Sequence, residues 1–127
     1  MAQEQENKIE QMWADIDKKV ETLSATLRKK VYPIVLQSVE ESGAHVIGYA
    51  YKPDMTTQLR LIDKSEGNAN GISLEAAGQA LEALIISAES DTRITDKNGE
   101  YYDVYWKGAC YSLKQFMGLA VPELKKK

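Results

Sequence analysis

The chain has 127 residues, a length typical of one domain, and its 43% hydrophobic and 28% charged residues exclude a wholly disordered polypeptide. Sixteen Lys and Arg residues against 19 Asp and Glu give a net charge of -3, which disfavours binding of duplex nucleic acid along a basic face. The single cysteine excludes an internal disulfide, and no apolar run approaches the roughly 20 residues that cross a bilayer. Because the polar, acidic start is unlike a secretory signal, we expect a cytoplasmic domain with no membrane contact.

The first predicted element is a long helix at residues 3–30. Apolar side chains recur along it in steps of four and three residues, which is typical of a heptad seam. This heptad seam consists of Ile9, Trp13, Ile16, Val20, Leu23 and Leu27. Acidic residues near the start of the helix and basic residues at its end complement the helix dipole. We therefore divide the chain into an N-terminal helix, 1–30, and a small α+β domain, 31–127.

Two β-rich runs follow, at residues 31–39 and 45–51. They are joined by a short segment that contains Gly43, so we predict an antiparallel hairpin. An isolated two-stranded hairpin is marginally stable in water, and we expect it to pack against the helices that follow.

Three further helices are predicted, at 55–64, 73–88 and 100–118, with Asp54 and Ser73 as N-caps of the first two. The polar segments 66–71 and 91–99 are predicted to be connections. The predicted fold is therefore α+β: a two-stranded antiparallel hairpin packed by about three helices, with a long N-terminal helix.

The sequence contains little that could catalyse a reaction. His45 and Cys110 are the only histidine and cysteine, and we place them in a strand and within a helix, as a strand histidine and a buried thiol. Two such residues cannot supply the three or four ligands of a zinc site. Asp91, Asp96 and Glu100 could bind a hard cation, but they do not match a calcium-loop pattern, and we favour a solvated loop. We expect no enzyme activity, cofactor or metal.

An aromatic cluster near the end of the chain raises the question of nucleic-acid binding, because bases stack on exposed rings beside basic groups. The cluster consists of Tyr101, Tyr102, Tyr105, Trp106 and Tyr111. Tyr102, Tyr105 and Trp106 recur at helical spacing with other apolar residues, so we assign them to the core. Tyr101 and Tyr111 fall off that stripe and are free to contact a partner.

The heptad seam is the most informative feature, because some surface must cover so long an apolar strip. The helix can fold back along its own domain, or it can pair with a second copy or with a partner's helix. Trp13 fits poorly into a tight two-stranded coil, which favours packing on a broader surface. We predict that all six seam residues contact a protein partner or a second copy. An unpaired edge of the hairpin is a second candidate, through strand addition.

From Lys30 onward the layout resembles small bacteriophage proteins encoded near tail genes, described as tail assembly chaperones or as uncharacterised tail-region proteins. The shared features are a hairpin that opens K-V-Y-P-I and returns as V-I-G-Y-A-Y-K-P-D, a helix with A-L-E-A-L-I-I, a tyrosine pair before the last helix, and the ending V-P-E-L-K-K-K. In those relatives the middle helix ends in a motif of the type Asn-Cys-Trp-Leu, whereas this chain has I-I-S-A-E-S-D and an additional N-terminal helix. The resemblance covers about three quarters of the chain.

This resemblance implies a non-catalytic phage protein that acts through protein–protein contact in the host cytoplasm. Two alternatives remain open: a structural or packaged component of the virion, and a small inhibitor of a host protein. Binding of single-stranded nucleic acid is a weaker possibility.

Overall fold

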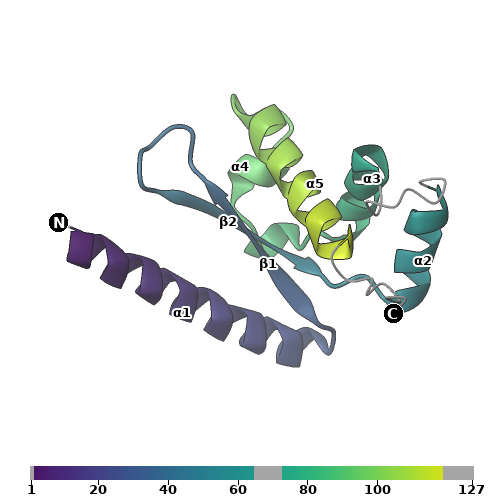
Figure 1. Ribbon diagram of the computed structural model, residues 1–127, viewed down its shortest axis with the longest axis horizontal. Helices are drawn as coiled ribbons and strands as arrows, with labels where there is room; N and C mark the ends of the chain where they lie inside the picture. The colour runs from purple at the N-terminus through teal and green to yellow at the C-terminus, as the bar shows by residue number, and fades with distance from the viewer. Residues whose placement is uncertain (1, 65–72, 119–127) are drawn as a thin grey trace, which may run out of the picture.

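The computed structural model describes residues 2–64 and 73–118, and within them it confirms the α+β fold. The elements in chain order are α1 (Ala2–Leu27), β1 (Val31–Gln37), β2 (His45–Tyr51), α2 (Met55–Lys64), α3 (Leu74–Leu84), the 3-10 turn η1 (Ser87–Glu89), α4 (Thr92–Thr95) and α5 (Tyr102–Gly118). The hairpin forms a middle layer, with α1 on one side and α3, α4 and α5 on the other (Figure 1).

The predicted hairpin is confirmed, although β1 ends at Gln37 and not at residue 39. The strands pair antiparallel, from Val31 opposite Tyr51 to Gln37 opposite His45. Gly43 lies in the turn with a φ of 81°, a backbone conformation that glycine adopts without steric cost. Side chains alternate between the two faces of the hairpin, so each face must be covered by a different layer.

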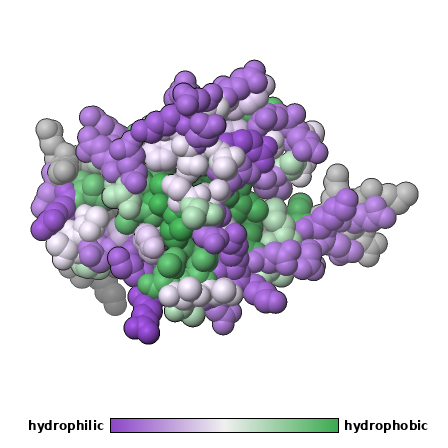
Figure 2. All heavy atoms as spheres, turned by 180° about the vertical axis from the view of Figure 1, so that it is seen from behind, coloured by the Kyte–Doolittle hydropathy of each residue, from purple (hydrophilic) through white to green (hydrophobic). Residues whose placement is uncertain are grey.

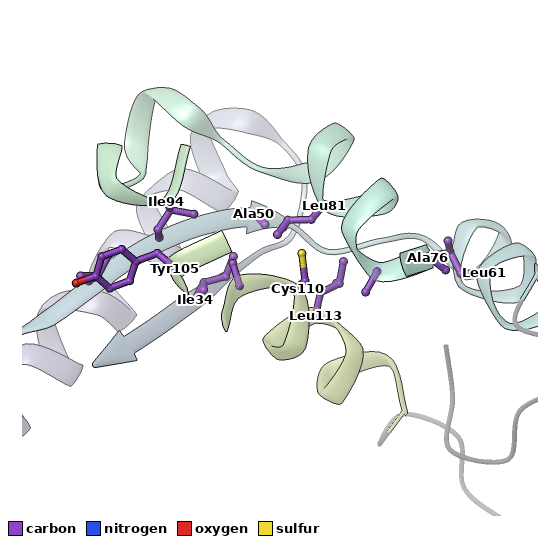
Figure 3. Close-up of a cluster of buried hydrophobic side chains, with 12 residues drawn as sticks. Ile34, Ala50, Leu61, Ala76, Leu81, Ile94, Tyr105, Cys110 and Leu113 are labelled. Atoms are coloured by element: carbon purple, nitrogen blue, oxygen red, sulfur yellow. The ribbon is translucent and has the colours of Figure 1, made fainter. Parts of the chain in front are cut away.

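The main core lies between the even-numbered face of the hairpin and the helices α3, α4 and α5. Figure 3 shows these side chains converging from both strands and from the helices above and below them. The buried members are Ile34, Val46, Ala50, Leu61, Ala76, Ala77, Leu81, Ile94, Tyr105, Ala109, Cys110 and Leu113.

A second, smaller core joins α1 to the odd-numbered face of the hairpin. Its buried members are Ile16 from α1, Val31 from β1 and Tyr49 from β2. Around them pack Met12, Val20, Leu23, Val35, Ile47, Tyr51 and Ile86. The long N-terminal helix is therefore part of the folded domain, because it supplies the cover for one face of the sheet.

Both predicted N-caps are confirmed. The Asp54 carboxylate accepts a hydrogen bond of 2.7 Å from the backbone N–H of Thr57, which holds the pKa of Asp54 below its ordinary value. The Ser73 hydroxyl accepts one of 3.1 Å from the N–H of Ala76. The predicted connection at 66–71 and the C-terminal motif at 121–127 lie outside the described residues.

The prediction that the middle helix extends to residue 88 is wrong, because α3 ends at Leu84. Ile85 is extended, with φ and ψ of -67° and 136°, and forms an antiparallel bridge with Ala50. The side chain of Ile85 packs on the main core and that of Ile86 on the core under α1, an alternation typical of a strand.

The segment from residue 85 to 91 then follows the outer edge of β2. Its Ile86 N–H donates to the Tyr49 carbonyl (2.8 Å), and its Asp91 N–H donates to the Ile47 carbonyl (2.9 Å). The buried hydroxyl of Ser90 accepts from the Tyr49 N–H at 2.9 Å. These bonds satisfy outward backbone groups of Ile47 and Tyr49 on β2. The segment 91–99, predicted to be a polar connection, contains the short helix α4.

Candidate protein-docking surface

The structure divides the heptad seam between contacts inside the chain and exposed side chains. Ile16 is only 2% exposed, and Val20 and Leu23 are half-buried against the hairpin. Ile9 and Trp13, near the start of α1, are 46% and 44% exposed, and Leu27 at the other end is 36% exposed. The centre of the seam is thus engaged within its own chain, and the predicted partner contact of the six residues stays a prediction.

A groove of about 420 Å³ lies between the first half of α1 and β2. Its apolar lining comes from Met12 and Ile16 of α1 and from Ile47 and Tyr49 of β2. Lys19 closes one side, with its Nζ 4.9 Å from the centre of the Tyr49 ring. The groove can receive an apolar side chain, but the exposed seam residues Ile9 and Trp13 do not line it.

Apolar surface also gathers elsewhere on the molecule. Figure 2 shows, from behind, a band of hydrophobic residues across the middle of the molecule, while the projecting start of α1 is largely hydrophilic. Exposed apolar pairs occur on α2 as well, where Met55 is 65% and Leu59 54% exposed. Exposure alone therefore does not single out α1; what distinguishes Ile9 and Trp13 is that they continue a seam whose centre packs on the hairpin.

The two edges of the hairpin differ. The edge of β2 is covered by the segment 85–91, as described above, whereas β1 has an open edge formed by the outward backbone groups of Pro33, Val35 and Gln37. The Ser24 hydroxyl of α1 accepts from the Val31 N–H at 3.1 Å and so closes the start of this edge. Pro33 has no N–H and occupies the kind of position to which proline is confined in sheets.

A second groove, of about 500 Å³, runs beside the open edge. Val35 and Leu36 of β1 form one wall, and Gly108 and Tyr111 of α5 form much of the other. A Cβ at Gly108 would lie 3.2 Å from a Leu36 methyl group, so the absence of a side chain there allows α5 to lie close to the strand. Strand addition was the second predicted mode of contact, and this is the edge at which it is sterically possible.

The structure also contains a polar cluster that the sequence did not reveal. The Tyr105 hydroxyl, at the buried end of a side chain that is 1% exposed, donates to Glu40 Oε1 at 2.8 Å and accepts from the Val39 N–H at 3.0 Å. These bonds join α5 to the turn of the hairpin. Tyr105 was assigned to the core from its helical spacing, which is confirmed, but its hydroxyl has this additional role.

Arg93 extends the cluster from α4. Its Nη2 lies 2.7 Å from Asp91 Oδ2, and its Nη1 lies 3.4 Å from Glu40 Oε1. The hydrogen bonds from Arg93 hold the pKa of Asp91 below its ordinary value, and Asp91 in turn raises the pKa of Arg93. Every charged group here has an opposite charge beside it, so the cluster fixes the turn and offers no free base.

His45 and Cys110 do not form a reactive pair. The Cys110 thiol is buried between α5 and α3, with its Sγ 3.4 Å from the position of a Cβ on Gly78, and burial raises its pKa. His45 lies at the start of β2 and lines a shallow hollow with Lys19 and Glu89. The thiol is therefore held in its neutral, poorly nucleophilic form.

The acidic loop residues are not gathered into a cation site. Asp91 is engaged by Arg93, and Asp96 accepts from the N–H of Asn98 at 3.0 Å. Among residues 2–64 and 73–118, no group of three or more His, Cys, Asp or Glu side chains is placed to hold a metal ion.

Of the remaining aromatic residues assigned to the core, Trp106 is half-buried and packs on the main core as predicted. Tyr102 is also half-buried, but it is not among the residues packed on that core; it stacks on Trp106 with ring centres 5.8 Å apart. Tyr101 and Tyr111, which fall off the stripe, are 36% and 53% exposed. Tyr111 lies beside the open edge of β1, so its exposure bears on protein contact.

Comparison with known proteins identifies no relative: no family model, no curated protein and no solved structure matches the chain. Within the part of the chain that the structure describes, no helix has the length and apolar character needed to span a membrane.

Proposed function

We propose that this protein is a non-catalytic bacteriophage assembly protein, similar to a tail assembly chaperone, that acts by protein–protein contact in the host cytoplasm. The assignment to a phage rests on the sequence resemblance from Lys30 onward. The mode of action rests on one structural observation: two large apolar side chains of α1, Ile9 and Trp13, stay exposed although the centre of the seam packs on the hairpin.

The expected partner is an apolar helical segment of another phage protein. Such a helix would cover Ile9 and Trp13. Burial of a large apolar side chain contributes about 1.5–3 kcal/mol, so a few such contacts give a reversible complex. Reversibility suits a chaperone, because the shielded segment must be released when assembly replaces the contact.

Co-expression tests the proposal. The tagged full chain is produced with the proteins encoded by the genes that flank its own, and the proteins retained with it are identified. We expect one of them to be retained by the wild type and to be lost from the double variant Ile9→Ala/Trp13→Ala.

The matched control is Met55→Ala/Leu59→Ala on α2, which also truncates two exposed apolar residues four positions apart. It should retain the partner. Equal retention by both double variants, or no retained neighbour-encoded protein at all, would refute the proposed contact.

Purified phage particles separate this function from the structural alternative. A chaperone is missing from mature particles, whereas a structural or packaged component remains in them at a fixed ratio to the other proteins. Detection of the chain in particles at such a ratio would replace the chaperone by a virion component.

A further inference from the structure

The open edge of β1 carries hydrogen-bonding groups that the chain itself does not use. Lys52 N–H donates to the Lys30 carbonyl and Ser38 N–H to the Ala44 carbonyl. The backbone N–H and C=O groups of the even-numbered residues between Lys30 and Ser38 therefore point toward β2. The N–H groups of Val35 and Gln37 therefore point outward, and no described residue accepts from them. Such an edge is a template for another strand.

We propose that a second copy of this chain occupies the open edge, with β1 paired antiparallel to β1 across a two-fold axis at Val35. In this register the Val35 N–H of each copy donates to the Val35 carbonyl of the other. Gln37 N–H donates to the Pro33 carbonyl of the second copy. Because Pro33 has no N–H, the Gln37 carbonyl opposite it receives no hydrogen bond. The other outward groups from Pro33 to Gln37 are all paired, so the edge is complementary to itself.

Charge complementarity supports the same register. Lys29 and Lys30 precede β1, and Glu40 and Glu41 follow it. An antiparallel two-fold arrangement brings the basic end of each strand to the acidic end of the other. Lys29 is engaged within the chain, with its Nζ 5.2 Å from the centre of the Tyr51 ring on β2. Among the described residues neither Lys30 nor Glu41 belongs to an ion pair, so these two charges are available to a second copy.

The position of α1 leaves room for this arrangement. Lys19 contacts the Tyr49 ring on β2, and from the opposite side of the helix Ser24 reaches the Val31 N–H on β1. α1 therefore crosses the hairpin, from β2 at Lys19 to the start of β1 at Ser24. Joining two hairpins edge to edge separates their midlines by two strand spacings, about 10 Å. Packed helices lie about 8–10 Å apart, so this separation admits two α1 helices in contact where each crosses its own hairpin.

The same arrangement covers apolar side chains that are otherwise exposed. Trp13 lies on the side of α1 that Ser24 shares, since positions 13, 17, 20 and 24 form one ridge of a helix. On the other face of the sheet, Tyr111 lies beside the strand and is 53% exposed. Val104, one helical turn before Gly108 on the same side of α5, is 48% exposed. A second copy would bury these residues, which a single chain leaves in water.

A matched pair of variants at Gln37 tests the strand pairing. Gln37→Pro removes the outward N–H without touching the bonds to β2, whereas Gln37→Ala keeps the N–H and removes only an exposed side chain. Sedimentation velocity over a range of concentrations measures the monomer–dimer equilibrium of the full chain. We expect a dimer for the wild type and Gln37→Ala, and a dissociation constant raised roughly 5- to 100-fold for Gln37→Pro. Circular dichroism checks that both variants stay folded.

Charge reversal tests the register. Lys30→Glu and Glu41→Lys should each weaken the dimer by about three- to tenfold, because each puts like charges together at both ends of the joined strands. The double variant Lys30→Glu/Glu41→Lys restores opposite charges and should recover most of the wild-type affinity. A double variant weaker than either single variant would refute this register.

Two results would overturn the inference: a monomer at every concentration, or a dimer that Gln37→Pro leaves as tight as Gln37→Ala does. The second copy and the partner helix would both cover Trp13 and would therefore compete for it. Gln37→Pro removes only the strand pairing and leaves Trp13 unchanged, so a monomeric result leaves the phage partner, read by co-purification, unrefuted.

Discussion

Replacement of Tyr105 by phenylalanine tests the role of the polar cluster that holds the hairpin turn. The change keeps the buried ring and removes a hydroxyl that donates to Glu40 and accepts from the Val39 N–H. The bond to Glu40 is charge-assisted, but that side chain is 36% exposed and water can replace part of the contact, so we assign it about 1–2 kcal/mol. The unpaired Val39 N–H adds about 1 kcal/mol. We expect Tyr105→Phe to lower the free energy of unfolding by about 2–3 kcal/mol.

Urea denaturation of the full chain measures this loss, and hydrogen exchange of the Val39 amide shows whether the turn has been released. Tyr111→Phe is the matched control, because Tyr111 lies on the same helix and is 53% exposed. It should change stability by less than about 0.5 kcal/mol. A loss for Tyr105→Phe no larger than that of the control would show that the hydroxyl does not hold the turn.

Three further changes are predicted, each followed by urea denaturation. Gly48→Ala places a Cβ 2.9 Å from the Cδ1 atom of Ile94, which is fully buried, and should destabilise the fold by about 1–2 kcal/mol; an unchanged stability would mean that Ile94 moves aside freely. Tyr32→Phe should stabilise the fold by about 1 kcal/mol, since the buried Tyr32 hydroxyl has no partner among the described residues. A loss of stability in this variant would show that the hydroxyl does have a partner. Asp91 has a lowered pKa because of Arg93, so its contribution is present above the usual aspartate pKa of about 3.9 and is lost as the pH falls below it. Asp91→Asn should therefore flatten the fall in stability between neutral and acidic pH, and an unchanged pH profile would contradict this.

The elements that could be predicted from the sequence are those fixed by local chemistry. Helical and strand periodicities located α1, both strands and α5, and single side chains located the starts of α2 and α3, where Asp54 and Ser73 cap the backbone. Gly43 marked the turn for the same reason, because the backbone there needs a positive φ.

What could not be predicted depends on tertiary contact. Ile85 and Ile86 continue the apolar pattern of a helix, yet they are extended because the outer edge of β2 offers them backbone hydrogen bonds. Their β-branched side chains were the signal that could have shown it. The bond between Tyr105 and Glu40 joins residues 65 positions apart, and no local pattern reports a pairing of that kind.

The heptad seam shows why a pattern identifies surface that needs a cover but not the surface that covers it. The hairpin is apolar on both faces, and α3 and α5 cover only one of them, so the free energy favours placing Ile16 over Val31 and Tyr49 within the chain. A chain that begins at Lys30 would expose that second face, including Tyr49, which is 5% exposed in the full chain. We expect such a truncated chain to aggregate or to unfold at much lower urea concentration, which light scattering and denaturation would detect. If it instead stays monomeric and as stable as the full chain, α1 contributes nothing to the fold, and the whole seam is available to another protein.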